Sequence, residues 1–287
     1  MSARKLLVSV SVADVRDKCS HISELLTQVI LGVGLEVIRT TRDRTWYLVR
    51  LPDNYVGWVR SWSVVPVSGV ELLKWTARIE YQVNRRSIPL REAPSVNSLV
   101  LCELVLGTRL PKLASREDWV KTVLPDSGRG WVESSGVQSL PASLATSSAI
   151  IETAVCFMGA PYLWGGTTPW GCDCSGLVQT VYSFNGVSLP RDAQDQLRAT
   201  RDCSVDIEVG RFQPADLLFF GRSLGHISHV GISTGGFSFI HSRGYVGRGS
   251  LKRGKLGHSL ELSRLLRAVT RPLRQVKKNV DKKKALQ

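Results

Sequence analysis

The sequence predicts two small all-β barrels followed by one larger domain of mixed helices and strands, the α+β class. Short strands with alternating apolar residues fill the first half of the 287-residue chain, and their pattern occurs twice. From Leu144 onward the apolar residues change to helical spacing. A cysteine at the start of one predicted helix is then followed, further along the chain, by a hairpin that carries two histidines.

An internal repeat organises the first half. A tryptophan, a Leu-Pro-Asp turn and a Gly-Trp-Val strand each recur 73 residues later. The repeated pairs are Trp46 and Trp119, Leu51 and Leu124, Asp53 and Asp126, and Trp58 and Trp131. The Pro-Asp element is typical of a tight hairpin turn, and the large aromatic residue after it can close one end of a barrel. Trp58, Trp119 and Trp131 are therefore expected in the barrel cores.

Two helices are predicted in the second half. The first covers residues 149–158 and is stopped by Gly159 and Pro161. The second begins at or just after Cys174 and ends at Asn185 and Gly186 in the manner of a helix C-cap. Because unpaired N–H groups give a helix N-terminus a partial positive charge, this position is expected to stabilise a thiolate at Cys174.

A hairpin of residues 225–232 and 237–241 would carry the two histidines. A two-residue Gly-Gly turn places His241 opposite Val230, which puts His229 on the other face. A three-residue loop over 234–236 places His229 opposite His241, and a suitable bulge also brings them to one face. Cooperation between the two imidazoles therefore requires the longer loop or a bulge.

The basic charge is concentrated at the end of the chain. Of the net charge of +14, the segment from Arg264 onward carries +8, with nine basic residues and one acid. This segment has no aromatic residue, unlike a folded nucleic-acid-binding face. Residues 275–287 are therefore expected to form a solvated, disordered tail that contacts anionic surfaces weakly at most, and no specific nucleic acid partner is expected.

Membrane spanning and metal binding are both disfavoured. No apolar run approaches the ~20 residues that cross a bilayer, and the apolar stretch at 6–13 is too short and serine-rich for a signal peptide. The six cysteines fit neither a disulfide scaffold nor a zinc site. We expect no metal and no cofactor, and a cytoplasmic location, with a periplasmic or extracellular one as the alternative.

The second half resembles the NlpC-type cell-wall peptidases, which are papain-like cysteine hydrolases, and the repeated half resembles bacterial SH3-like domains. The peptidase motifs are Tyr162 with Trp164 to Gly166, Asp173 to Gly176, Leu189 to Arg191, His229 to Ile232, and Ile240 with His241. The resemblance predicts SH3-like domains over 1–68 and 77–140, a peptidase domain over 145–274 and a basic tail over 275–287.

The resemblance implies a catalytic set. Cys174 would be the nucleophile, His229 the general base and then acid, and His241 the group that orients His229. Tyr162 would help to stabilise the tetrahedral oxyanion. These roles agree with the chemistry, since a Cys–His pair needs a third polar group to fix the tautomer, and an oxyanion needs donors in place before charge develops.

The combination of two barrels and a peptidase further resembles endopeptidases that cut the γ-D-glutamyl–diamino acid bond of stem peptides with a free N-terminal L-alanine. The resemblance places Asp192, with Asp173 as its companion, on the alanine ammonium. It adds Ser175 and Arg191 to the substrate-binding residues, and Tyr55 and Tyr81 to the pocket wall. A buried ammonium needs carboxylate partners, and an acetylated N-terminus would leave those partners unpaired.

These features predict a thiol peptidase that acts through a thioester acyl-enzyme in the recycling of released wall peptides. One alternative is an exported hydrolase that cuts intact peptidoglycan and uses the barrels as anchors. A different class is a non-catalytic wall-binding scaffold. The presence of Cys174, His229 and His241 together argues against the scaffold.

Overall fold

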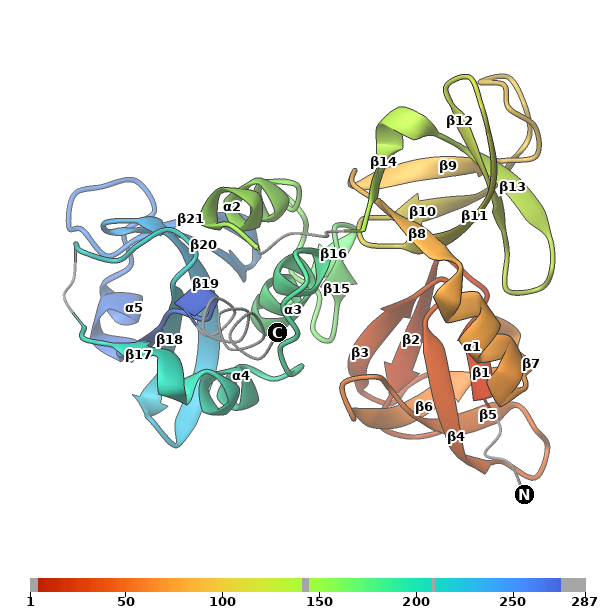
Figure 1. Cartoon of the computed structure of the whole chain (residues 1–287). Helices are drawn as coiled ribbons and strands as arrows, with labels where there is room; N and C mark the ends of the chain where they lie inside the picture. The colour runs from red at the N-terminus through yellow and green to blue at the C-terminus, as the bar shows by residue number, and fades with distance from the viewer. Residues whose placement is uncertain (1–4, 141–144, 208–209, 275–287) are drawn as a thin grey trace, which may run out of the picture. The chain divides into compact units, whose positions relative to one another are not determined.

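The computed structural model describes residues 5–140, 145–207 and 210–274. The chain forms two compact units, Met1–Leu140 and Pro141–Gln287. The first unit holds two all-β barrels and the second a domain of helices packed on a sheet (Figure 1), so the predicted fold class is confirmed. The predicted tail, 275–287, lies outside the described residues.

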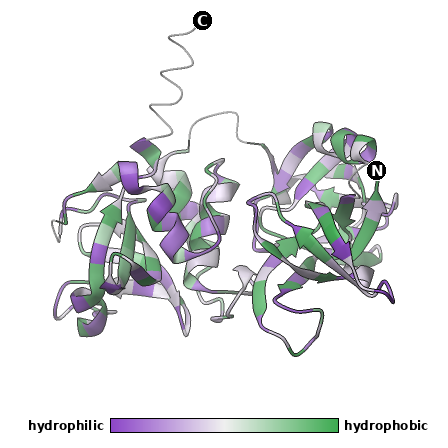
Figure 2. Cartoon of the chain, turned by 90° about the horizontal axis from the view of Figure 1, so that it is seen from below, coloured by the Kyte–Doolittle hydropathy of each residue, from purple (hydrophilic) through white to green (hydrophobic). Residues whose placement is uncertain are grey.

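The first barrel is a seven-stranded antiparallel sheet in the order β3-β2-β6-β5-β4-β1-β7. Its strands are β1 (Lys5–Val8), β2 (Val12–Arg16), β3 (Leu25–Ile30), β4 (Gly34–Thr40), β5 (Trp46–Arg50), β6 (Val56–Arg60) and β7 (Val64–Val67), with a 3-10 turn, η1 (Ser61–Ser63). All seven strands contribute to one buried cluster, which includes Leu6, Val29 and Val59. The sheet therefore closes around a single core, and many of its apolar residues lie along the strands (Figure 2).

The second barrel repeats the first strand for strand. Its order, β10-β9-β13-β12-β11-β8-β14, is that of the first barrel with each number raised by seven. The strands are β8 (Ile79–Val83), β9 (Ser87–Arg91), β10 (Val100–Val105), β11 (Arg109–Arg116), β12 (Trp119–Val123), β13 (Arg129–Glu133) and β14 (Val137–Ser139), with η2 (Ser134–Gly136). The Pro-Asp turns match as well, since Asn54 and Ser127 have positive φ values of 69° and 72°. The sequence repeat is thus a structural repeat.

A helix between the barrels is absent from the sequence-based prediction. Helix α1 (Gly69–Ala77) starts in a capping box, in which the Ser68 hydroxyl accepts from the Glu71 N–H and the Glu71 carboxylate accepts from the Ser68 N–H. The buried Trp75 of this helix donates its indole N–H to the Gly32 carbonyl at 3.0 Å. Leu31 packs into the core of the second barrel. The helix therefore ties the two barrels into one unit.

The prediction of core tryptophans is only partly correct. Trp58 and Trp119 are buried, whereas Trp131 is half-buried. Trp58 alternates with the core residue Val59, so its ring lies on the other face of β6, where the Arg39 guanidinium covers it. The Lys121 ammonium covers Trp131 in the same way.

The peptidase-like unit is built on a six-stranded antiparallel sheet in the order β17-β22-β18-β19-β20-β21. The strands are β17 (Ser204–Val205), β18 (Leu217–Ser223), β19 (His226–Gly235), β20 (Ser238–Arg243), β21 (Tyr245–Ser250) and β22 (Leu266–Thr270), and a two-stranded ribbon is formed by β15 (Thr167–Thr168) and β16 (Gly171–Cys172). The helices are α2 (Ser147–Val155), α3 (Cys174–Phe184), α4 (Ala193–Ala199) and α5 (Leu260–Leu265), with η3 (Arg201–Cys203). Helix α3 packs on β19 and β20, whereas α5 contacts β18.

Both predicted helices of this unit exist, with shifted ends. Helix α2 starts two residues before the predicted 149 because the Thr146 hydroxyl caps it, accepting from the Ala149 N–H at 3.2 Å. It stops at Val155, three residues before the predicted end. Helix α3 begins at Cys174 and is followed by Asn185 as its C-cap and by Gly186 at φ +79°, as predicted.

Candidate active site

Cys174 is the first residue of α3, where the sequence places it. Its side chain is buried, with 7% exposed. The thiol lies against the β19 backbone, because the N–H of Val230 hydrogen-bonds the sulfur, as does the N–H of Ser175 in its own helix. Val230 directly follows His229. The packing of α3 on β19 therefore brings the cysteine to the strand that carries the first histidine.

The two histidines lie on one face of the sheet, and a bulge puts them there. Ile232 pairs with Ile240 and Ser233 with Phe239, but the next pair is Gly235 with Ser238, so Thr234 is an extra residue. The bulge is one of the two solutions that the sequence analysis left open. Direct pairing of the histidines is wrong, because this register continues to Gly231 opposite His241, with His229 two residues further along.

The imidazoles are joined by a hydrogen bond. His229 Nε2 and His241 Nδ1 are 2.8 Å apart, and the rings meet edge to face at 76° with centroids 5.0 Å apart. Phe220 packs beside His229 and Phe239 beside His241, so an apolar wall holds each ring. With Nε2 committed to His241, Nδ1 is the nitrogen of His229 that can take a proton from a thiol.

The electrostatics of the site keep its resting groups neutral. Burial, followed by the Asp173 carboxylate, raises the pKa of the Cys174 thiol to about 11. Burial lowers the pKa of His229 to about 3, and that of His241 to about 4. The expected stabilisation of the thiolate by the helix N-terminus is present but outweighed in this buried site: the backbone N–H groups lower the pKa of the thiol, and burial raises it more.

Tyr162 is held beside the thiol by backbone pairing. Its N–H donates to the Gly244 carbonyl at 2.9 Å, and it forms a bridge with Cys172. Burial, followed by the negative charges of Cys174 and Asp173, raises the pKa of the Tyr162 phenol to about 12. The hydroxyl is therefore protonated at neutral pH and able to donate a hydrogen bond.

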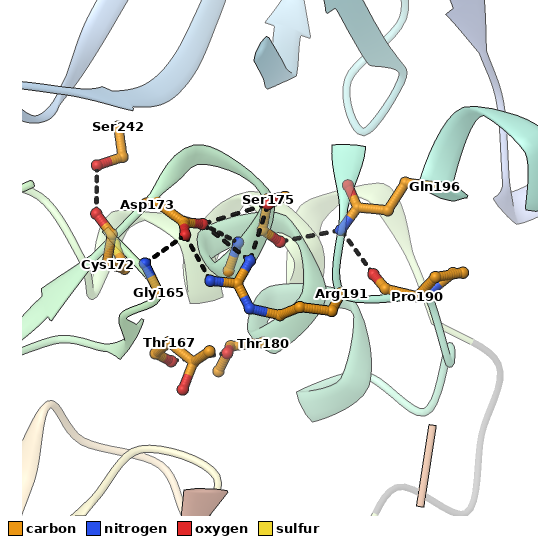
Figure 3. Close-up of polar contacts among 11 residues, drawn as sticks. Gly165, Thr167, Cys172, Asp173, Ser175, Thr180, Pro190, Arg191, Gln196 and Ser242 are labelled. Carbon is orange, nitrogen blue, oxygen red and sulfur yellow. Dashed lines mark hydrogen bonds and ion pairs between the residues drawn. The ribbon is translucent and has the colours of Figure 1, made fainter. Parts of the chain in front are cut away.

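Asp173 caps α3 and is the centre of a buried polar network (Figure 3). Its Oδ1 accepts from the Gly176 N–H at 2.7 Å, the Ser175 hydroxyl at 3.2 Å and Arg191 Nη1 at 3.0 Å. Its Oδ2 accepts from the Gly165 N–H at 2.9 Å and from Arg191 Nη2. These contacts occupy the acceptor sites of the carboxylate, and they disfavour the expected role of Asp173 in holding a substrate ammonium.

Three further predicted substrate residues differ in their surroundings. Arg191 and Ser175 are buried, with 2% and 6% exposed, and the hydroxyl of Ser175 accepts from Arg191 Nη1 at 2.9 Å. Asp192 is exposed at the N-cap position of α4, where its side chain makes no cap hydrogen bond. Of these three residues, Asp192 is therefore the one that presents its side chain to solvent.

Tyr55 and Tyr81 belong to the other compact unit. Tyr55 packs against the core of the first barrel, and Tyr81 against that of the second, where its hydroxyl accepts from Lys112 Nζ at 3.3 Å. Their assignment to a pocket wall stays a prediction.

Cys172, the second thiol of the Cys-x-Cys pair, is fully buried in β16, and burial raises its pKa to about 12. The six cysteines all lie within the described residues, and none of them forms a disulfide. In the described part of the chain, no group of three or more histidine, cysteine, aspartate or glutamate side chains could hold a metal ion. None of the helices described has the length and apolarity needed to cross a bilayer.

A cysteine at a helix start, packed against a strand whose histidine is oriented by a second imidazole, has the arrangement of a cysteine peptidase. Comparison with known proteins agrees with this class. Residues 159–260 match the NlpC/P60 family model, residues 15–63 the bacterial dipeptidyl-peptidase SH3 domain and residues 86–138 the bacterial SH3 domain. The chain therefore contains an NlpC/P60 domain preceded by two bacterial SH3 domains, as expected for a cysteine peptidase.

Known proteins match this chain over most of its length. A γ-D-glutamyl-L-lysine dipeptidyl-peptidase of Bacillus subtilis is 29% identical over 75% of this chain and 71% of its own. Dipeptidyl-peptidase 6 of Lysinibacillus sphaericus is 26% identical over 77% of this chain and 80% of its own. The crystal structure of an NlpC/P60 family protein from Bacillus cereus has the same fold, with a TM-score of 0.80 at 23% identity, covering 94% of this chain and 99% of that chain.

Proposed function

We propose that this protein hydrolyses peptidoglycan peptides, and that its bond is the γ-D-glutamyl–diamino acid bond of stem peptides with a free N-terminal L-alanine. The names of the Bacillus and Lysinibacillus relatives both support dipeptide release, and the Bacillus name supports a γ-D-glutamyl substrate. The observation that carries the proposal is the 2.8 Å hydrogen bond between His229 Nε2 and His241 Nδ1. His229 lies in β19, the strand whose Val230 N–H contacts the Cys174 sulfur.

In this mechanism the thiol proton of Cys174 passes to Nδ1 of His229 as the sulfur attacks the γ-carbonyl carbon of D-glutamate. The tetrahedral oxyanion accepts a hydrogen bond from the Tyr162 hydroxyl. When the C–N bond breaks, His229 returns the proton to the leaving amine of the diamino acid. A water molecule, deprotonated by His229, then hydrolyses the thioester and releases L-Ala-γ-D-Glu with the free thiol.

His241 keeps the imidazole of His229 in the correct tautomer and orientation throughout this cycle. The low pKa of both histidines means that the base is neutral before the reaction. Charge then appears on the sulfur and the imidazole together, so that each stabilises the other in the buried site.

Mass spectrometry of the peptide L-Ala-γ-D-Glu-diaminopimelate tests the nucleophile. We expect cleavage by the unmodified protein and a loss of about 10⁴-fold or more in the Cys174→Ala variant. Cys203→Ala is the matched control, because Cys203 is also buried but lies in η3, outside the site. An uncut peptide, or cleavage that survives Cys174→Ala, would remove the mechanism and favour the non-catalytic scaffold.

N-acetylation of the alanine tests recognition of the ammonium. In the proposal the exposed Asp192 carboxylate receives this group, so acetylation is expected to lower kcat/KM at least about 10²-fold. Asp192→Asn should lower activity on the free peptide and shrink that difference, whereas Asp195→Asn in the same helix should do neither. Equal turnover of both peptides by the unmodified protein would defeat this part of the proposal.

We place the reaction in the cytoplasmic recycling of released wall peptides. In intact peptidoglycan the alanine amine is attached to the glycan, so intact sacculi should resist cleavage, and the same peptides should be cut after an amidase has released them. Cleavage of intact sacculi at a comparable rate would instead support an exported hydrolase.

A further inference from the structure

The buried pair of Asp173 and Arg191 lies directly beside the nucleophile. The side chains are 8% and 2% exposed, and the guanidinium meets the carboxylate as a two-pronged fork. Such a pair has lost most of its hydration, so it persists only where its members satisfy one another.

The substrate has no access to the charges of this pair. Two Arg191 nitrogens, two backbone N–H groups and one hydroxyl already surround the Asp173 carboxylate. A carboxylate offers about four lone-pair sites, so an incoming ammonium would have to displace one of these donors.

The network joins three segments that meet at the site (Figure 3). Asp173 holds the first turn of α3 through the Gly176 N–H, and the loop after Tyr162 through the Gly165 N–H. Arg191 adds the segment before α4, whose next residue is Asp192. Gln196 closes the network, because its Nε2 donates to the carbonyls of Ser175 and Pro190, each at 2.9 Å.

We propose that Asp173 and Arg191 are positioning residues, whose ion pair fixes the start of α3 against the Tyr162 loop and neutralises the carboxylate next to the Cys174 sulfur. The proposal deepens the function proposed above and rests on Cys174 being the nucleophile. It assigns substrate recognition to neither residue.

The charges around the thiol give this pair an electrostatic consequence. The titratable or charged groups that interact with Cys174 in the described part of the chain are Tyr162, Cys172, Asp173 and Arg191. His229 directly precedes Val230, whose N–H contacts the sulfur. After burial, the Asp173 carboxylate is the largest cause that raises the pKa of the thiol, and Arg191 opposes it. Removing the guanidinium would therefore expose the forming thiolate to an uncompensated negative charge, and removing the carboxylate would expose it to an uncompensated positive charge.

The experiment is the pH dependence of alkylation of Cys174 by iodoacetamide, followed by tandem mass spectrometry of the peptide that contains it. This small, uncharged probe needs no substrate pocket. Arg191→Met is expected to raise the midpoint of the alkylation profile by about one pH unit, which slows alkylation at pH 7 about tenfold. Asp173→Asn, which keeps an oxygen to cap α3, is expected to lower the midpoint by a similar amount. The double variant is expected to return close to the unmodified protein.

Arg271→Met is the matched control, because Arg271 forms a similar fork with the buried Asp216 elsewhere in the domain. Its alkylation profile should coincide with that of the unmodified protein. Circular dichroism selects the variants that fold. If Arg191→Met does not fold, the Asp173→Asn variant and the double variant still give two shifts to compare.

Unshifted midpoints of the alkylation profile in the folded variants, together with a raised KM at unchanged kcat, would overturn the proposal. That result would show that both residues bind the substrate. Shifted midpoints with a lowered kcat and little change in KM support it. Failure of the proposed function is a separate outcome, because it would appear as hydrolysis that survives complete alkylation of Cys174 in the unmodified protein.

Discussion

Two aspartate–arginine pairs with buried carboxylates lie near opposite ends of α3, and they share their chemistry but not their surroundings. At the start of the helix, Asp173 and Arg191 contact the segment that carries the nucleophile. Near its other end, the Tyr182 hydroxyl donates to the carbonyl of Ala215, the residue before Asp216. The Asp216 carboxylate is fully buried and accepts from Arg271 Nε at 2.6 Å and Nη2 at 2.8 Å.

The second pair fastens the sheet. Asp216 precedes β18, Arg271 follows β22, and these strands are neighbours. The Gln213 N–H also donates to Asp216 Oδ2 at 2.8 Å. The surroundings of such an ion pair, rather than the contact itself, therefore set its role: we expect the first pair to act on catalysis because a thiol lies beside it, and the second to act on stability alone.

The largest effects are expected when the carboxylate of each pair is removed in turn, because the two substitutions should differ in their effect on hydrolysis. Asp216→Ala leaves the Arg271 guanidinium without its partner and should lower the free energy of unfolding by about 3 kcal/mol. The kcat of the folded protein should stay within about twofold. Asp173→Ala should cost a similar amount of stability and also lower hydrolysis about 10²-fold, because Cys174 and the Tyr162 loop lose their common anchor.

Urea unfolding, followed by tryptophan fluorescence, measures the first quantity, and hydrolysis of the peptide well below the unfolding midpoint measures the second. An equal loss of hydrolysis in both variants would show that stability alone explains the role of Asp173.

A smaller effect is expected at Gly231, which lies on the sheet face that carries the histidines. An alanine Cβ there would lie 2.9 Å from Phe239 Cδ2 and 3.4 Å from His241 Cβ. We expect Gly231→Ala to cost about 1–3 kcal/mol through overpacking and to lower kcat roughly tenfold by displacing His241. Gly69→Ala is the control, since no atom outside its chain neighbours and its own helix backbone lies within 4 Å of its added Cβ. Unchanged kcat in Gly231→Ala would mean that the imidazole tolerates displacement.

The histidine pair should also make stability depend on pH. Burial lowers the pKa of His229 to about 3 and of His241 to about 4, from 6.5. Between pH 6.5 and 4 the unfolded chain therefore binds more protons at these residues than the folded protein does, so stability falls as the pH falls. Each histidine contributes a slope of up to about 1.4 kcal/mol per pH unit.

Urea titrations at pH 4.5, 5.5 and 6.5 measure this slope. His229→Gln should reduce it, whereas His226→Gln, at an exposed position, should leave it unchanged. An identical slope in His229→Gln would mean that other groups cause the loss of stability in acid.

The sequence predicts the features of the fold and the site that depend on local patterns. The 73-residue repeat predicts both barrels because Trp46 and Trp119 occupy equivalent strands. The two glycines after Thr234 fit several turns, so the sequence cannot decide where the hairpin bulges. The ion pair of Asp173 with Arg191 depends on tertiary packing between residues 18 apart, and no local pattern encodes it.

One missed element had a local signal. Ser68 and Glu71 have the spacing of a capping box, which predicts the start of α1, but the surrounding strand pattern obscured it. The missed face of Trp58 has a different cause. A large aromatic residue can pack in a barrel core or stack under an arginine guanidinium on the outer face, and only the strand register decides between the two positions.

The smallest expected effect belongs to a third aspartate–arginine pair, which has the same chemistry without burial. Asp195 and Arg198 lie one turn apart on α4 with their nitrogen and oxygen 2.7 Å from each other, and their side chains are 46% and 69% exposed. Water screens such a pair, so Asp195→Ala should change the free energy of unfolding by at most about 0.5 kcal/mol and leave kcat unchanged. The same urea and hydrolysis measurements apply. A loss near that of Asp216→Ala would show that the aspartate–arginine contact itself, rather than its burial, sets the stability of this domain.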